Sequence, residues 1–200
     1  MTRIMRDSTT PADIPLQGLQ LVAGYVNGRF MWNSMEWGRF PAEVSRVHID
    51  VNGTAYKTAG VLDVETGDAT PQEAAVWVTA RKRLGAGATG CTIYCNRSTI
   101  NPVHAAMTAA GYEIGRDYTL WVATLDGTVI LPTMTGVVAV QARGEAQTGG
   151  HYDESVVYDD AWHAETVVVP GPPWQRTALM AAQRAQVAVG DLVKLLEAHQ

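Results

Sequence analysis

The 200-residue sequence has little cysteine, little excess charge and no long apolar run, and each shortage excludes a class of protein. It carries 15 Lys and Arg against 20 Asp and Glu, a formal net charge of −5 that argues against non-specific nucleic-acid binding. No apolar stretch approaches the ~20 residues of a membrane-spanning helix, so no membrane partner is expected. The amino terminus turns acidic at Asp7 before an apolar signal region could form, so we expect no export signal.

Cysteine and histidine are too sparse and too scattered to predict a disulfide or a metal site. Cys91 and Cys95 stand four apart in a strand-like segment, which separates their Cα atoms by about 13 Å, whereas a disulfide needs about 7 Å or less. We therefore predict two free, buried thiols. The five histidines are dispersed, and no glycine-rich phosphate loop is present, so neither a metal nor another cofactor is expected.

Short apolar segments rich in Val, Ile, Tyr and Trp recur, separated by turns or by helix-like stretches. Eight strands are predicted, near residues 4–6, 19–25, 46–51, 60–64, 90–94, 118–123, 136–141 and 155–158. Helices are predicted at 34–40, 71–84 and 102–110. The second has Thr70 as N-cap, Pro71 in its first turn and Glu73 completing a capping box.

The alternation of strands and helices is typical of parallel βαβ units. Eight strands in about 160 residues predict a compact (β/α)8 TIM-type barrel with abbreviated helices, because a full barrel takes around 250 residues. Loops are expected to replace helices before Gly60 and after Asp126. An open doubly wound sheet is the alternative.

A proline-rich segment divides the sequence near its end. Three prolines and a glycine fill residues 170–173, which predicts a stiff linker over 167–176 after a barrel domain at 1–166. Residues 177–200 follow with apolar side chains at alternating steps of three and four, as in a docking or oligomerisation helix. Packing of this helix on the domain's own surface is the alternative.

The segment at 60–67 carries the clearest chemical signal. Asp63 and Glu65 end an apolar strand, point to the same face and have Cα atoms about 6–7 Å apart. At the mouth of a barrel, two such carboxyl groups raise each other's pKa, so one can stay protonated while the other is ionised. Glycoside hydrolysis needs this division of roles. A pair of solvated carboxylates or a calcium-like cluster is the alternative.

Other residues at predicted strand ends could complete such a rim. Asp7, Asp50 and Asp153 each resemble helix caps or turn residues alone, but together they would line one end of a barrel. Aromatic side chains near the same ends could stack against sugar rings or belong to the core: Tyr25, Trp32, Tyr94 and Trp121.

The order of these motifs resembles the glycoside hydrolase family 25 lysozymes and their actinobacterial and phage glycoside hydrolase-like relatives. The resemblance spans about residues 1–163 and rests on Asp7-Ser, Asp63-Val-Glu65, Ile93-Tyr94 followed by Asn-Arg-Ser, Trp121-Val-Ala, Ala139-Val-Gln141 and Tyr152-Asp153. Thr124 stands where the family often has an aspartate, and no cell-wall-binding repeat is recognisable.

The resemblance implies a muramidase that cleaves the β-1,4 bond between N-acetylmuramic acid and N-acetylglucosamine in peptidoglycan. It implies Glu65 as general acid, with Asp63 assisting the developing charge or orienting the substrate N-acetyl group. Asp7 and Asp153 match an outer acidic pair. Tyr94 and Gln141 would line the sugar site. Tyr25, Asp50 and Trp121 are added to this site from their places at the predicted strand ends.

A non-catalytic phage virion protein, in the capsid or tail, is the alternative function. The barrel would then bind glycan or act as a scaffold, and the helix at 177–200 would dock on virion proteins or a second copy. In either case we expect synthesis in the host cytoplasm. The protein would then reach the cell wall with the help of a holin or be built into the virion, with peptidoglycan or another surface glycan as partner.

Overall fold

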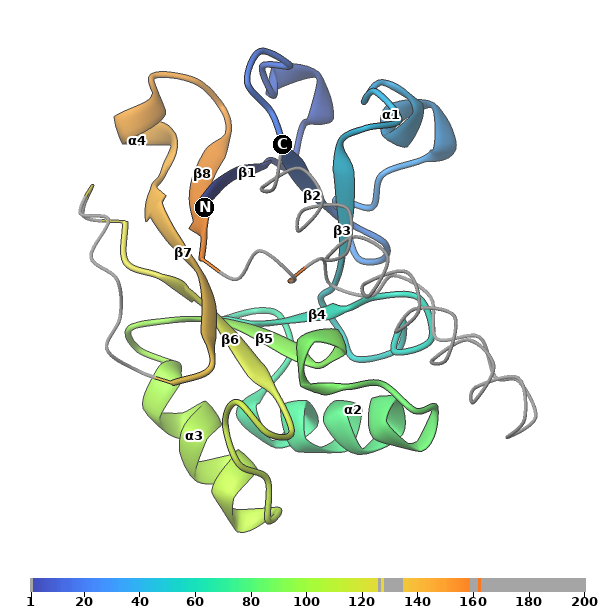
Figure 1. Ribbon diagram of the computed structural model, residues 1–200, viewed down its shortest axis with the longest axis vertical. Coiled ribbons are helices and arrows are strands. Elements are labelled where there is room, and N and C mark those ends of the chain that lie inside the picture. The colour runs from blue at the N-terminus through green and yellow to red at the C-terminus, as the bar shows by residue number, and fades with distance from the viewer. Residues whose placement is uncertain (1, 126, 128–134, 159–161, 163–200) are drawn as a thin grey trace, which may run out of the picture. The chain divides into compact units, whose positions relative to one another are not determined.

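The computed structural model describes residues 2–125, 127, 135–158 and 162, and within them eight strands form a closed barrel in sequence order (Figure 1). The strands are β1 (Arg3–Asp7), β2 (Leu21–Tyr25), β3 (Ser45–Asp50), β4 (Val61–Val64), β5 (Thr92–Asn96), β6 (Thr119–Ala123), β7 (Val137–Arg143) and β8 (Asp153–Val157). All eight predicted strands are confirmed, and closure of the sheet excludes the open doubly wound alternative.

The last strand departs from the parallel βαβ pattern that the alternation of strands and helices indicated. Neighbouring strands from β1 to β7 are parallel, whereas β8 runs antiparallel to both β7 and β1. The segment 144–152 between β7 and β8 contains only α4 (Glu145–Thr148). A parallel crossover takes a dozen or more residues, so this short connection returns the chain in the opposite direction. The start of β8 therefore lies at the same end of the barrel as the carboxyl ends of β1 to β7.

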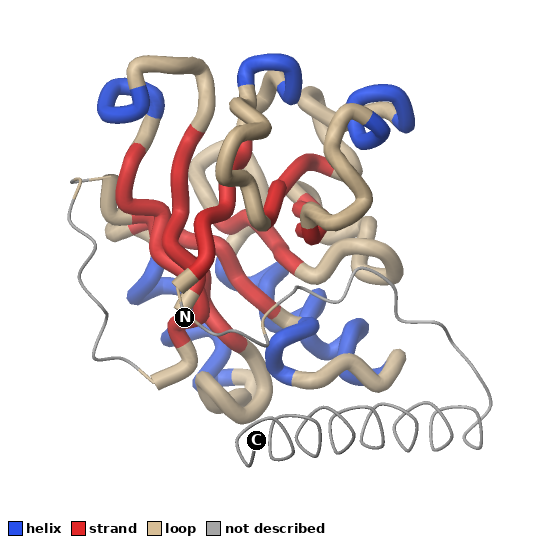
Figure 2. The backbone as a smooth tube through the Cα atoms, turned by 45° about the horizontal axis from the view of Figure 1, so that its top comes forward, coloured by secondary structure: helices blue, strands red, loops and turns tan. Residues whose placement is uncertain are grey.

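Among the described residues, the helices lie outside the ring of strands (Figure 2). The longer ones, α2 (Pro71–Arg83) and α3 (Ile100–Ala109), pack against each other beside β4 and β5. The remaining helical segments are short: η1 (Pro11–Asp13), α1 (Ser34–Gly38) and η2 (Ala88–Gly90). A loop joins β3 to β4 as predicted, and most of the segment after Asp126 lies outside the described residues.

The predicted start of α2 is confirmed in detail. The Glu73 backbone N–H donates to Thr70 Oγ1 at 3.3 Å, and the Thr70 backbone N–H donates to Glu73 Oε2 at 2.7 Å. Helix α3 begins two residues earlier than predicted, with Thr99 at its N-cap. Pro102 thus sits in the first turn, where its missing N–H costs no intrahelical bond.

The barrel interior is apolar through most of its depth, with Met5, Leu21, Val61 and Trp121 among its buried side chains. Trp162, just after β8, is fully buried there, and its indole N–H donates to Thr92 Oγ1 at 2.8 Å. Because Thr92 begins β5, this contact lies at the amino-terminal end of the parallel strands. The opposite end of the interior is left for polar side chains.

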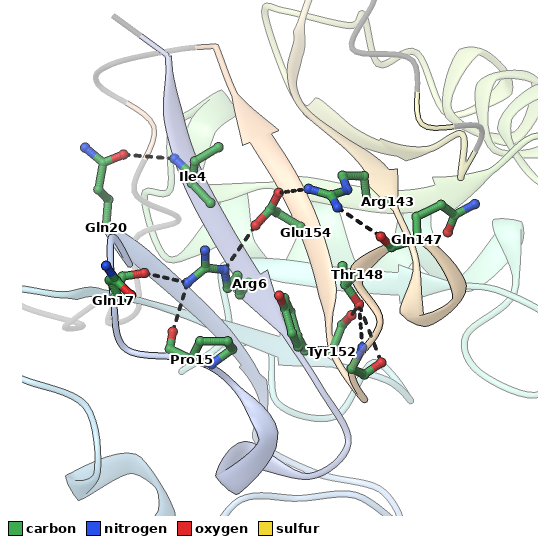
Figure 3. Close-up of polar contacts among 11 residues, drawn as sticks. Ile4, Arg6, Pro15, Gln17, Gln20, Arg143, Gln147, Thr148, Tyr152 and Glu154 are labelled. Carbon is green, nitrogen blue, oxygen red and sulfur yellow. Dashed lines mark hydrogen bonds and ion pairs between the residues drawn. The ribbon is translucent and has the colours of Figure 1, made fainter.

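On the outside of the barrel, charged side chains join β8 to both neighbours (Figure 3). Glu154 accepts from Arg6 Nε of β1 at 3.1 Å and from Arg143 Nη1 of β7 at 3.2 Å. Successive residues of a strand face opposite sides, so the outward Arg6 and Glu154 place Asp7 and Asp153 inside. Ion pairs therefore join β8 to its neighbours on the outer face of the barrel, while the inner face of the same strands carries two aspartates.

The linker predicted at 167–176 and the helix predicted at 177–200 lie outside the described residues. Cys91 and Cys95 are both buried thiols that form no disulfide, as predicted.

Candidate active site

Four carboxyl-bearing residues meet at the open end of the barrel interior. Asp7 ends β1, Asp63 lies in β4, Glu65 directly follows β4, and Asp153 begins β8 opposite Asp7 in the strand register. All four line one cavity of about 80 Å³, whose other walls are Tyr25, Ile49, Tyr94 and Trp121. The structure thus brings together the residues predicted to be catalytic, from three separate parts of the sequence.

This inner cavity adjoins a larger one of about 330 Å³, because Tyr25, Asp63 and Glu65 line both. The larger cavity is built from the four loops that follow β1, β2, β3 and β4, and its remaining lining residues are Thr9, Asn27, Arg29, Phe30, Val51, Thr66, Gly67 and Asp68. The two cavities together offer a path from the protein surface to the carboxyl cluster.

Asp7 and Asp63 are buried without complete hydrogen bonding. Each side chain belongs to a residue that is only 5% exposed, and Oδ1 of each lacks a hydrogen-bond partner among the described residues. Burial, then the charges of Asp153 and Glu65, raises the pKa of Asp7 well above its usual value. Burial, then Glu65, Asp68 and Asp7, does the same to the pKa of Asp63. Both groups therefore hold protons at a pH where an ordinary aspartate is ionised.

Asp153 is held by a neighbouring amide. Gln141 Nε2 donates to Asp153 Oδ2 at 2.6 Å, which favours the ionised form, but burial and the nearby Glu145 charge outweigh this and raise the pKa of Asp153 to about 6. Gln141 is 2% exposed and lines neither cavity. It was predicted to contact sugar, and the structure instead places it behind Asp153, where it orients that carboxyl group.

Glu65 is half-buried and is oriented by a residue that sequence reasoning did not assign to the site. Asn96 Nδ2 donates to Glu65 Oε1 at 2.8 Å. Asn96 is itself fixed, because its Oδ1 accepts from the Ser98 backbone N–H at 2.8 Å in an Asx turn. The Asn-Arg-Ser turn after β5 was the available signal for this role.

Three of the predicted aromatic residues border the inner cavity. Tyr94 and Trp121 pack edge to face, with ring centroids 4.8 Å apart, and the Trp121 indole N–H donates to Ser155 Oγ at 3.0 Å. Both are at least nine-tenths buried, so they form the floor rather than an exposed sugar platform. Tyr25 is more exposed, and its burial, followed by the charges of Asp7 and Asp63, raises the pKa of its hydroxyl group. Trp32 lies in the outer core against Phe40, away from both cavities.

Asp50 was predicted to line the sugar site, and the structure places it elsewhere. It is fully buried and lines neither cavity. Its carboxylate accepts from Asn27 Nδ2 at 2.8 Å and from the Trp77 indole N–H at 2.9 Å, and backbone N–H groups of the β3–β4 loop complete the set. Asp50 therefore anchors the loop and α2, and no lone pair is left to face a substrate.

Among the described residues, no cluster of three or more His, Cys, Asp and Glu has the arrangement of a metal site. In the same part of the chain, no helix has the length and apolar character needed to cross a membrane.

Comparisons with known proteins give a likeness in structure only. No family model and no curated protein matches the chain. A family 25 glycosyl hydrolase from Bacillus anthracis is 14% identical, with 84% of this chain and 94% of that chain covered and a TM-score of 0.49. A muramidase from Acremonium alcalophilum is 12% identical, with 84% and 98% covered and a TM-score of 0.46. The two neighbours have the family and the activity that the order of motifs in this sequence resembles.

Proposed function

We propose that this chain is a peptidoglycan-directed glycoside hydrolase of the muramidase type. The observation that carries the proposal is the convergence of Asp7, Asp63, Glu65 and Asp153 on one accessible cavity. Buried carboxyl oxygens without hydrogen-bond partners cost folding free energy, and such groups with shifted pKa values concentrate at functional sites. Glycosidases place two carboxyl groups about the bond they cleave, one as proton donor and one ionised.

The surroundings of Glu65 support its role as general acid. It lines both cavities, so a sugar chain in the larger cavity could bring its glycosidic oxygen to this carboxyl group. Asn96 restricts its orientation through the bond to Oε1. The raised pKa of Asp63 and Asp7 means that the cluster is not fully ionised at mildly acidic pH, so a proton is available there.

Asp63 would act on the same substrate from deeper in the barrel. When ionised it would stabilise the positive charge that develops on the sugar ring, and when protonated it would donate to the N-acetyl carbonyl. Asp7 and Asp153 would act through their charge, by raising the pKa of the neighbouring carboxyl groups and so keeping protons in the cluster. The proposal includes a phage or actinobacterial source, which rests on the sequence resemblance. It also includes docking by residues 177–200, which rests on their apolar pattern.

A glycan-binding barrel without cleavage is the competing function. It is favoured by Thr124, which replaces the family's aspartate and whose hydroxyl donates to the Gln141 carbonyl at 3.4 Å. Thr124 lines neither cavity and has no carboxyl group, so this position adds no acidic side chain to the site.

The rate of reducing-end release from purified peptidoglycan separates the two functions. Glu65→Gln keeps an oxygen to accept from Asn96 but cannot donate the proton, so we expect a loss of about 10²–10⁴-fold in rate. Glu43→Gln makes the same chemical change at an exposed residue outside both cavities and should leave the rate unchanged. Glycan binding without cleavage by the unaltered chain would favour the competing function, and full activity of Glu65→Gln would remove Glu65 from the mechanism.

A further inference from the structure

The rim of the larger cavity carries two side chains that the proposed chemistry does not use. Arg29 and Phe30 lie in the loop between β2 and α1 and are both exposed, Phe30 by 46%. Arg29 Cζ lies 5.4 Å from the centroid of the Phe30 ring, and this ring lies 6.5 Å from that of Tyr25. A cation and an exposed aromatic ring therefore stand together beside the route to the carboxyl cluster.

The loop that carries these residues is held in place by its neighbours. Gly28 has a φ of +77°, and a Cβ added to it would lie 2.4 Å from Val51 Cγ2, so only glycine fits this close approach. Asn27 Oδ1 accepts from the Val51 backbone N–H at 2.9 Å, and the Trp32 backbone N–H donates to the Tyr25 carbonyl at 2.9 Å. The position of Arg29 and Phe30 at the rim is thus built into the loop.

The charge of Arg29 is opposite to that of every other ionised group in the cavity wall. Asp63, Glu65 and Asp68 line the same cavity, and Arg29 is its only basic lining residue within the described part of the chain. No ion pair or hydrogen bond of Arg29 to another described residue is present, so its donors are free to meet a ligand. An anionic group that enters would be attracted to Arg29 and repelled from the acidic end.

We propose that Arg29 and Phe30 form a subsite for a carboxylate-bearing unit of the glycan, and this rests on the proposed function. A guanidinium binds a carboxylate through two parallel hydrogen bonds, and the Phe30 ring offers an apolar surface to the face of a sugar. The carboxylate can belong to the sugar itself or to a peptide attached to it. The subsite would thereby distinguish acidic peptidoglycan from a neutral N-acetylglucosamine polymer.

Binding of three ligands to the Glu65→Gln chain, measured by calorimetry, tests this subsite without cleavage. The ligands are a neutral N-acetylglucosamine oligomer, peptide-free glycan strands with free sugar carboxylates, and glycan fragments with peptide stems. We expect a carboxylated ligand to bind more tightly than the neutral one. Adding Arg29→Gln should weaken only the carboxylated ligand, by about five- to ten-fold, and Arg29→Lys should weaken it less.

Arg83→Gln on the exposed end of α2 removes the same charge outside the cavities and is the matched control. Selective weakening of the peptide-free strands assigns the subsite to a sugar carboxylate, and selective weakening of the stem-bearing fragments assigns it to the peptide. Binding of all three ligands that is unaffected by Arg29→Gln, or weakened equally, overturns the subsite and leaves the proposed function standing. Binding of none of them, with no cleavage by the unaltered chain, overturns both.

Discussion

Asp50 and Asp63 are buried aspartates in neighbouring strands, but Asp50 stabilises the fold whereas Asp63 lines the candidate site. Asp50 has hydrogen-bond donors from Asn27, Trp77 and the loop backbone on both oxygens. Asp63 Oδ1 has no hydrogen-bond donor among the described residues. The Asp63 side chain lines a cavity, and its pKa is raised. Burial of a carboxyl group alone therefore does not mark a functional residue. Incomplete hydrogen bonding toward an open cavity is the feature that separates them.

The largest expected effect is the loss of glycan cleavage when Asp63, the aspartate that lines the cavity, is replaced. Asp63→Asn replaces an ionisable carboxyl group in the inner cavity by an amide of the same shape, so we expect at least about a 10²-fold loss in the rate of glycan cleavage. The melting temperature should stay the same or rise, because like-charge repulsion is relieved. Steady-state kinetics and calorimetry check both parts. An active variant, or one that unfolds easily, would make Asp63 a structural residue like Asp50.

The reverse result is expected for Asp50→Asn. The amide cannot accept from all the donors that surround the Asp50 carboxylate, so we expect a loss of about 2 kcal/mol, or about 4–8 °C in melting temperature. Cleavage by the folded variant should persist because Asp50 lines neither cavity. Thermal unfolding and activity at a temperature well below the transition check this. Unchanged stability with lost activity would reverse the assignment of the two aspartates.

The pH dependence should follow the cavity carboxyl groups. Asp153 has a folded pKa of about 6, above its ordinary unfolded value, so the folded state binds more protons and the stability from this group falls as pH rises from about 4 to about 6. Activity should also decline above about pH 6 as the cluster loses its protons. Asp153→Asn should flatten the stability profile in this window. An identical profile in that variant would contradict the raised pKa.

The smallest effect is expected one residue further along β8. Glu154 faces outward and pairs with Arg6 and Arg143, so Glu154→Gln should cost up to about 1 kcal/mol of stability. The cleavage rate should be unchanged, since the side chain points away from the cavity. Comparison of Glu154→Gln with Asp153→Asn in unfolding and in kinetics tests whether the two faces of the strand are separate. Loss of activity in Glu154→Gln would show that they are not.

The sequence was sufficient to predict the strands and the acidic cluster, because both depend on local patterns. Short apolar segments rich in Val, Ile, Tyr and Trp located all eight strands, and acidic residues at strand ends located Asp7, Asp63, Glu65 and Asp153. The antiparallel direction of β8 was missed, since an apolar segment does not encode strand direction. Only the shortness of the 144–152 connection could have indicated it.

The sequence was insufficient where a residue's role depends on distant partners. Asp50 looks like the other acidic strand ends, and its donors come from Asn27 and Trp77, which lie 23 and 27 residues away. Arg29 and Phe30 lie in a loop with no periodic pattern, so their place beside the cavity could be known only from the fold.

The most direct test of the account is mass spectrometry of the fragments that the full chain releases from purified peptidoglycan. The account predicts fragments that end in a reducing N-acetylmuramic acid and that are absent when Glu65 is replaced by Gln. Release of no fragments, or of the same fragments by both proteins, would contradict it.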